Sequence, residues 1–177
     1  MLFRSVMQLV DARLQALVFV DQRVADQHAR HAGIFLGEAE QRQEVLTLLL
    51  LDTNVLIDAE RSALDLDELI ADDDEPAIAA ITIAELGVGV EVATGKRRQA
   101  RKAFLDDIVE TLPVMSYDID VARTHTQLLV AVRKAGRLRA AHDLIIAATA
   151  LATGRVVVTS DRLGFDDLPG VPVRRPG

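Results

Sequence analysis

Several residue types are scarce in this chain, and each absence excludes a class of protein. There is no cysteine among the 177 residues, which excludes a disulfide framework and metal sites built from thiolates. This is compatible with the reducing cytoplasm, where we expect the protein to act. Aromatic residues make up only 3% of the chain, which argues against single-strand binding by base stacking on an aromatic platform. No apolar run approaches the length of a membrane-spanning helix, so we expect no membrane association.

Positive charge is scarce as well. The chain has 20 Lys and Arg against 27 Asp and Glu, a formal net charge of −7, so bulk electrostatics do not favour binding to nucleic acid. A polyanionic substrate would have to be held by local basic patches or by metal ions bound to acidic side chains. Apolar residues, in contrast, make up 50% of the chain, which is enough for one domain of ordinary size with a buried core.

Residues 1–46 differ from the rest of the chain. They contain neither proline nor lysine, and polar residues interrupt the first apolar run too early for a signal peptide. We expect an N-terminal extension with little functional content, either a helical arm or the product of an upstream choice of start codon. In the second case the native protein would begin near Val45. The functional domain is expected to span residues 47–177.

From residue 47 onward the pattern alternates between short apolar strands and helices. Four consecutive leucines, Leu48–Leu51, indicate a strand that is buried on both faces, as in a parallel sheet. Further strands are expected at 77–81, 114–115, 155–159 and near 173. Helices are expected at about 53–60, 65–72, 82–93, 96–112, 118–135 and 144–152. This alternation predicts an α/β protein of three layers, α/β/α, with a mainly parallel central sheet.

Local signals add three expectations about the ends of these elements. Thr53 or Asn54 can cap the helix that follows the first strand. The acidic run Asp72–Pro76 is expected to be a solvated loop, because adjacent like charges repel and need water. Thr82 and Glu85 match the capping-box pattern at the start of a helix.

Four acids from separate parts of the chain are expected at one edge of the sheet: Asp52, Glu85, Asp143 and Asp161. Asp52 and Asp161 follow strands, and the carboxyl ends of parallel strands share an edge. Taken singly, each acid has an ordinary interpretation as a cap, a capping-box partner or a turn residue. Together they would repel one another and raise each other's pKa unless cations offset the charge. Ligands that are all oxygen suit Mg²⁺ or Mn²⁺ rather than zinc.

The chain resembles the PIN-domain family, and within it the VapC-type ribonuclease toxins of type II toxin–antitoxin modules. Four matching segments cover nearly all of residues 48–174 in the family's order: LLLDTNVLID (Leu49–Asp58), ITIAELGVGV (Ile81–Val90), HDLIIAATALATG (His142–Gly154) and VVVTSDRLGFDDLPGVPV (Val156–Val173). Residues 1–46 match nothing in the family, so the resemblance does not interpret them.

The resemblance implies specific roles and partners. It makes Asp52, Glu85, Asp143 and Asp161 a catalytic, metal-binding quartet, with Asn54 and Ser160 supporting the site by hydrogen bonding. It implies a homodimer that cleaves RNA with the help of Mg²⁺ (or Mn²⁺) and is neutralised by a cognate antitoxin. A carboxylate that is not fully engaged with metal, Glu85 or Asp161, could orient the attacking water or accept its proton.

Binding of RNA by an acidic protein would fall to its few basic clusters. Each cluster, taken alone, is more simply a solvated helix face. The candidates are Lys96, Arg97, Arg98, Arg101, Lys102, Arg133, Lys134, Arg137 and Arg139. His142, beside Asp143, is interpreted as a packing or capping residue.

Three alternatives remain open from the sequence. A phosphatase with a nucleophilic aspartate would need a second Asp where Asn54 stands, and a lysine near the site. A metal-dependent nuclease could act on DNA instead of RNA. A PIN-like binding module without nuclease activity would not need the four acids.

Overall fold

The computed structural model describes residues 47–176, so the expectations for residues 1–46 lie outside the described part of the chain. The order of its elements is the one that the alternation predicts. The elements are β1 (Thr47–Leu51), α2 (Thr53–Glu60), α3 (Leu66–Leu69), β2 (Asp74–Ala79), α4 (Ala80–Glu91), α5 (Gly95–Thr111), β3 (Val114–Met115), α6 (Ile119–Lys134), α7 (Ala141–Ala152), β4 (Val156–Val158), α8 (Arg162–Phe165) and β5 (Val173–Arg174).

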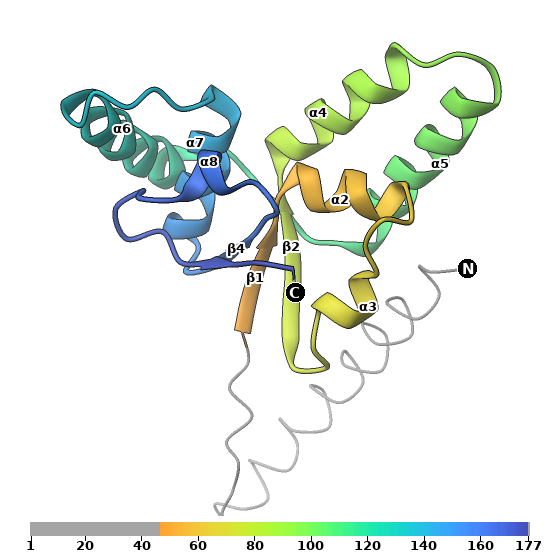
Figure 1. Cartoon of the computed structure of the whole chain (residues 1–177), viewed down its shortest axis with the longest axis horizontal. Coiled ribbons are helices and arrows are strands. Elements are labelled where there is room, and N and C mark those ends of the chain that lie inside the picture. Colours follow the sequence, from red (N-terminus) through yellow and green to blue (C-terminus); the bar gives the residue numbers. More distant parts are fainter. Residues whose placement is uncertain (1–46, 177) are drawn as a thin grey trace, which may run out of the picture. The chain divides into compact units, whose positions relative to one another are not determined.

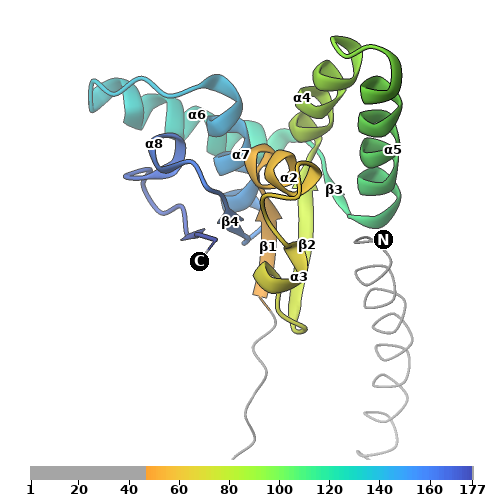
Figure 2. The same cartoon turned by 45° about the vertical axis from the view of Figure 1, so that its right-hand side comes forward.

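The strands form one parallel sheet in the order β3-β2-β1-β4-β5, with β1 in the middle. Helices α2 and α3 lie on one side of the sheet and α6 and α7 on the other (Figures 1 and 2). The predicted three-layer α/β/α fold is therefore confirmed, and its sheet is parallel throughout. Within residues 47–176, none of the helices combines the length and the apolar character that crossing a bilayer would require.

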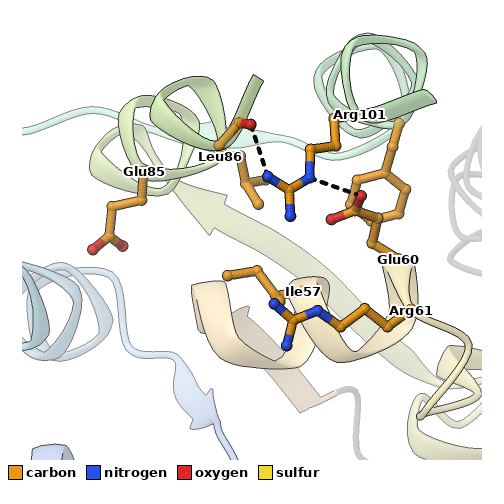
Figure 3. Close-up of a pocket in the computed structure, with 8 residues that line it drawn as sticks. Ile57, Glu60, Arg61, Glu85, Leu86 and Arg101 are labelled. Atoms are coloured by element: carbon orange, nitrogen blue, oxygen red, sulfur yellow. Dashed lines mark hydrogen bonds and ion pairs between the residues drawn. The ribbon is translucent and has the colours of Figure 1, made fainter. Parts of the chain in front are cut away.

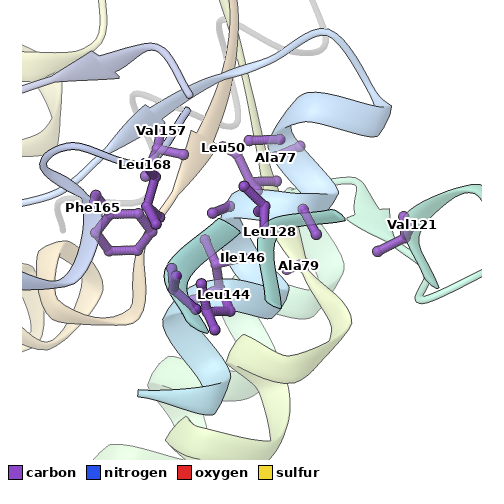
Figure 4. Packing of buried hydrophobic residues seen from close by; sticks show 14 residues of the cluster. Leu50, Ala77, Ala79, Val121, Leu128, Leu144, Ile146, Val157, Phe165 and Leu168 are labelled. Carbon is purple, nitrogen blue, oxygen red and sulfur yellow. The ribbon is translucent and has the colours of Figure 1, made fainter. Parts of the chain in front are cut away.

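The run of leucines in β1 supplies both layers of the core. Successive side chains of a strand point to opposite faces. Leu50 joins the cluster formed with α6 and α7, where it packs with Ile146, Leu128 and other buried residues (Figure 4). Leu49 and Leu51 point to the other face, and all three leucines are fully buried. Burial on both faces explains why this strand is continuously apolar instead of alternating.

The solvated loop predicted at Asp72–Pro76 is wrong from Asp74 onward. Strand β2 begins at Asp74, whose side chain is buried and pairs with Arg174. The Asp74 carboxylate also accepts the amide of Ala71 at 2.9 Å. A buried carboxylate is tolerated when it is paired and hydrogen-bonded, so these contacts remove the need for water on which the prediction rested.

Two predicted helix caps are also wrong. Asp52 itself caps α2, since its side chain accepts the Thr53 amide, and Thr53 is already helical. Helix α4 begins at Ala80, directly after β2, so Thr82 lies inside the first turn and forms no capping box with Glu85. The segment from Ala77 is uniformly apolar and contains no residue that would mark the end of the strand, so the sequence placed this boundary too late.

Candidate active site

Asp52 follows directly on β1 and is held by two hydrogen bonds. Only 2% of its surface is exposed. The Thr53 amide donates to Oδ1 at 2.8 Å, and the hydroxyl of Thr159, which follows β4, donates to Oδ2 at 2.7 Å. The Asp52 amide in turn donates to the carbonyl of Val158 at 2.9 Å. The carboxylate is therefore fixed in direction at the carboxyl edge of the sheet.

The titration of Asp52 reflects both burial and neighbouring charge. Burial raises the pKa of Asp52 from its ordinary value of 3.8 to about 6, although the hydrogen bonds from Thr159 and Thr53 act in the opposite direction. The negative charges of Asp143 and Glu85 raise this pKa further. A cation bound among these side chains would offset the repulsion.

Asp143 and Asp161 approach each other beside Gly164. Asp143 lies in the first turn of α7, and Asp161 caps α8 by accepting the Leu163 amide at 2.8 Å. A Cβ atom on Gly164 would lie 2.8 Å from Oδ2 of Asp143 and 2.9 Å from Oδ2 of Asp161, which is closer than such atoms pack. Both carboxylates therefore border a space that exists because residue 164 has no side chain.

Charge connects this pair to the other acids. Burial raises the pKa of Asp143, and the charges of Asp161 and Glu85 raise it further, whereas His142 and Arg139 lower it. The charges of Asp143 and Glu85 act on the pKa of Asp52 as well. Thr159 bonds to both Asp52 and the Asp161 amide, and Glu85 bonds to the residues next to Asp52 and Asp143, so the structure brings all four predicted acids to one edge of the sheet.

Glu85 reaches the same edge from α4 and is tied to two residues that lie far from it in sequence. The hydroxyl of Thr53 donates to Oε2 at 2.5 Å. Nδ1 of His142 lies 2.7 Å from Oε1. Thr53 follows Asp52, and His142 precedes Asp143. Glu85 is therefore bound to the immediate sequence neighbours of two other acids of the site.

The chemistry of these ligands fits a hard divalent cation. The site offers carboxylate oxygens alone, held beside the open space at Gly164, and such ligands suit Mg²⁺ or Mn²⁺. As the side chains stand, no three acidic or histidine residues within 47–176 are grouped so that they could hold a metal ion together. Oδ2 of Asp143 and Oδ2 of Asp161 nevertheless border the same space at Gly164.

Comparison with known proteins identifies the fold family. A model of the PIN domain matches residues 49–171. The chain belongs to the PIN-domain family. It is 40% identical over 115 residues to Ribonuclease VapC5 of Mycobacterium tuberculosis, an alignment that covers 63% of this chain and 82% of that protein. It is 32% identical over 129 residues to VapC ribonuclease Y4jK of Sinorhizobium fredii, covering 67% of this chain and 91% of the relative.

A solved structure agrees with these relatives. The crystal structure of VapBC-5 from Mycobacterium tuberculosis, a member of the VapBC family of toxin–antitoxin systems, matches this PIN domain with a TM-score of 0.60 and 32% sequence identity. The match covers 73% of this chain and 97% of that chain. The sequence resemblance to the PIN-domain family is thereby confirmed.

The two residues predicted to support the site lie at its border in this PIN domain. The Asn54 side chain is exposed and makes no hydrogen bond within the described residues. The hydroxyl of Ser160 donates to Oδ2 of Asp58 at 3.3 Å. Neither bonds to one of the four acids, and their supporting role stays a prediction.

Most of the predicted RNA-binding residues have acidic or carbonyl partners. Arg98 pairs with Glu91 at 2.8 Å, Lys102 with Asp106 at 2.5 Å, and Arg137 with Asp167. Lys96 and Arg97, at the start of α5, are exposed and have no partner inside the described region. Arg133 and Lys134, near the end of α6, are likewise exposed and without a described partner.

Arg101 has a structural role that the sequence did not indicate. Its guanidinium donates to Oε1 of Glu60 at 3.3 Å and to the carbonyl of Gly89 at 2.8 Å, and its side chain is only 16% exposed. These contacts join α5 to α2 and α4. Arg139 similarly donates to the carbonyl of Asp166 at 2.9 Å, beside the acidic site.

A small pocket lies beside Glu85, between α2, α4 and α5 (Figure 3). Its volume is about 60 Å³, far below the size of a cofactor pocket. Arg61 also lines it, and Figure 3 shows the Arg61 guanidinium along the α2 side. In the part of the chain that the structure describes, this guanidinium has no hydrogen-bond or ion-pair partner. Arg61 is thus a basic residue near the site that sequence reasoning missed.

Sequence reasoning also missed Thr159 as a partner of Asp52. Its hydroxyl, besides donating to Asp52, accepts the amide of Asp161 at 2.9 Å. Arg175 then donates to the carbonyls of Thr159 at 3.2 Å and Asp161 at 2.5 Å. The sequence feature that could have revealed this role is the position of Thr159, because it is the first residue after β4.

Proposed function

We propose that this PIN domain is a metal-dependent endoribonuclease and the toxin of a toxin–antitoxin pair. The observation that carries the proposal is the convergence of Asp52, Glu85, Asp143 and Asp161 at one edge of the sheet. The relatives named as VapC ribonucleases support RNA as the substrate. The hydrolysed bond would be a phosphodiester bond within the RNA chain.

The four acids would hold Mg²⁺ or Mn²⁺. When bound, such an ion activates water and offsets the charge that develops on the phosphoryl oxygens. Thr159 and the Thr53 amide keep the Asp52 carboxylate turned toward the site. Glu85 is partly exposed, and its hydrogen bonds with Thr53 and His142 hold its carboxylate in one direction, so it would orient the attacking water or accept its proton.

The same relatives support the first of the partners that we propose. The match to VapBC-5 supports a cognate antitoxin that inhibits the enzyme. We propose a homodimer that acts in the cytoplasm. RNA would reach the acidic site with the help of exposed basic residues, of which Lys96 and Arg97 are candidates without a described partner.

The decisive experiment measures cleavage of RNA by variants that lose one acid. We expect Asp52→Asn and Asp143→Asn to abolish cleavage while circular dichroism shows a folded protein. Asp107→Asn is the matched control, because Asp107 is an exposed acid on α5. EDTA should stop the reaction, and Mg²⁺ or Mn²⁺ should restore it.

Two results would contradict this proposal. Cleavage that persists in a carefully purified Asp52→Asn, Asp143→Asn double variant would show that the acids are not the catalytic centre. A wild-type protein that binds an antitoxin but cleaves no RNA in the presence of Mg²⁺ or Mn²⁺ would favour a binding module.

A further inference from the structure

Both carboxylate oxygens of Glu85 have a separate hydrogen-bond partner. Thr53 Oγ1 lies 2.5 Å from Oε2, and His142 Nδ1 lies 2.7 Å from Oε1. Two partners on two oxygens fix the rotation of the carboxylate about its terminal bond. Each oxygen still has a lone pair to spare, because an ionised carboxylate can accept about four hydrogen bonds.

His142 is not placed as a packing residue. Its side chain is 51% exposed, so removal of the imidazole leaves no cavity in the core. The Glu85 side chain is itself 27% exposed, and ion pairs or hydrogen bonds in such positions add little to the stability of a fold. The consequence of the contact is therefore the direction of Glu85.

The contact also joins three elements of the site. Glu85 belongs to α4, Thr53 opens α2 directly after Asp52, and His142 lies in the first turn of α7 directly before Asp143. A rotation of Glu85 away from His142 would leave α4 without this connection to α7. Its two hydrogen bonds therefore align Glu85 with Asp52 and Asp143, because Thr53 and His142 are the sequence neighbours of these two acids.

We propose that His142 is a positioning residue, whose Nδ1–H donates to Glu85 and holds that carboxylate in its working direction. The inference rests on the proposed function, in which Glu85 orients the attacking water or accepts its proton. In neutral imidazole only one nitrogen carries hydrogen, so donation from Nδ1 leaves Nε2 unprotonated. His142 acts through Glu85 and needs no contact with RNA.

The first test compares three substitutions in RNA-cleavage kinetics. His142→Ala should lower kcat about tenfold or more while KM stays unchanged, since loss of a group that orients a ligand or base has effects of this size. His142→Asn places an amide donor near the position of Nδ1 and should restore much of kcat. His142→Gln is the matched control, because its donor extends beyond that position. Wild-type kcat in His142→Ala, or equal losses in all three variants, would overturn the proposal.

A double-mutant cycle tests whether His142 acts through Glu85. In a Glu85→Gln background, which already lacks the charged carboxylate, His142→Ala should lower kcat by much less than it does in the wild type. If His142→Ala lowers kcat by the same factor in both backgrounds, His142 contributes independently of Glu85 and the inference is overturned.

A measurement without RNA separates this inference from the proposed function. In the metal-free protein at alkaline pH, ¹⁵N NMR of the histidine ring should show His142 protonated at Nδ1, and Glu85→Ala should abolish this preference. Protonation at Nε2 in the wild type would contradict the positioning role of His142, even if the enzyme cleaves RNA. An Nδ1–H signal in a protein that cleaves no RNA would leave the pairing intact and reject the nuclease assignment, and with it the role of the pairing in catalysis.

Discussion

The Thr159 hydroxyl donates to Oδ2 of Asp52 at 2.7 Å, and this bond joins residues that stand 107 positions apart in the sequence. Both residues are buried and follow the ends of adjacent strands, β1 and β4. A hydrogen bond to a buried carboxylate favours its charged form. Thr159 therefore counteracts the burial that raises the pKa of Asp52.

Substitution of Thr159 tests this relationship. Thr159→Val keeps the shape of the side chain but removes the hydroxyl, so Asp52 loses a donor and the Asp161 amide loses an acceptor. We expect a loss of about 1–3 kcal/mol in the free energy of unfolding. Urea titration measures this loss, and cleavage should fall in parallel. Thr159→Ser keeps the hydroxyl and should lose much less of this free energy of unfolding. Equal losses in the two variants would show that the effect comes from packing and not from the hydroxyl.

Without metal, the buried charge of Asp52 should make stability depend on pH. Its pKa is about 6 in the folded protein against an ordinary 3.8, so the folded state binds this proton more tightly than the unfolded state. The resulting stabilisation is complete below about pH 4 and is lost as pH rises through about 6, a loss on the order of 3 kcal/mol. The raised pKa of Asp143 acts in the same direction.

Urea midpoints in EDTA across this pH range measure the effect. Asp52→Asn should have a flatter pH profile than the wild type and should be the more stable protein at neutral pH. Mg²⁺ should restore stability to the wild type at neutral pH. A wild type whose stability rises through the same pH range would contradict the buried-charge account.

Gly164 offers a test of the metal site that does not change any acid. Gly164→Ala would place a methyl group 2.8–2.9 Å from the Asp143 and Asp161 carboxylates, which must then move apart. We expect Mn²⁺ affinity, measured by calorimetry, to fall about tenfold or more, as it does when the groups that orient metal ligands are lost.

The control for this change is Gly87→Ala in helix α4. An added Cβ at Gly87 meets no atom within 4 Å, so this variant should bind Mn²⁺ normally and gain up to about 1 kcal/mol from its better helix propensity. Normal Mn²⁺ binding by Gly164→Ala would show that the space beside residue 164 is not used by a metal.

The basic residues should separate into those that bind RNA and those that hold the fold. Lys96→Glu with Arg97→Glu should weaken RNA binding and reduce the slope of log affinity against log salt by roughly 0.7 per lost phosphate contact. Arg101→Ala should instead destabilise the fold by about 1–3 kcal/mol, because Arg101 binds Glu60 and the Gly89 carbonyl. Binding titrations over a range of salt concentrations provide the measurement, and an unchanged slope in the Lys96, Arg97 variant would locate the RNA elsewhere.

The sequence was sufficient where a local pattern determines the structure. Leu48–Leu51 indicates a strand buried on both faces, and the parallel order of strands then places Asp52 and Asp161 at one edge. Glu85 and Asp143 lie in the N-terminal halves of α4 and α7, and a helix that leads from or to a parallel strand has its direction set by that strand. These inferences need only the strand order and the spacing of the acids.

The sequence was insufficient where a partner lies far along the chain. Asp74 is buried because Arg174 pairs with it from a position 100 residues away. The residues around His142 indicate a packing or capping residue, and only the fold places its Nδ1 at 2.7 Å from Oε1 of Glu85. The same holds for Arg101, whose carboxylate partner, Glu60, lies 41 residues before it. No local pattern encodes such pairings.

The N-cap position of Asp52 has a practical consequence for work in living cells. Asparagine caps a helix about as well as aspartate does, so Asp52→Asn removes the charge while α2 keeps its first turn. Asp52→Ala would also remove the cap, so a loss of activity in that variant could come either from a damaged fold or from the missing carboxylate. If the proposed pairing with an antitoxin holds, a folded and harmless Asp52→Asn protein would compete for that antitoxin and release the native enzyme. Its overproduction would then slow growth without cleaving any RNA itself.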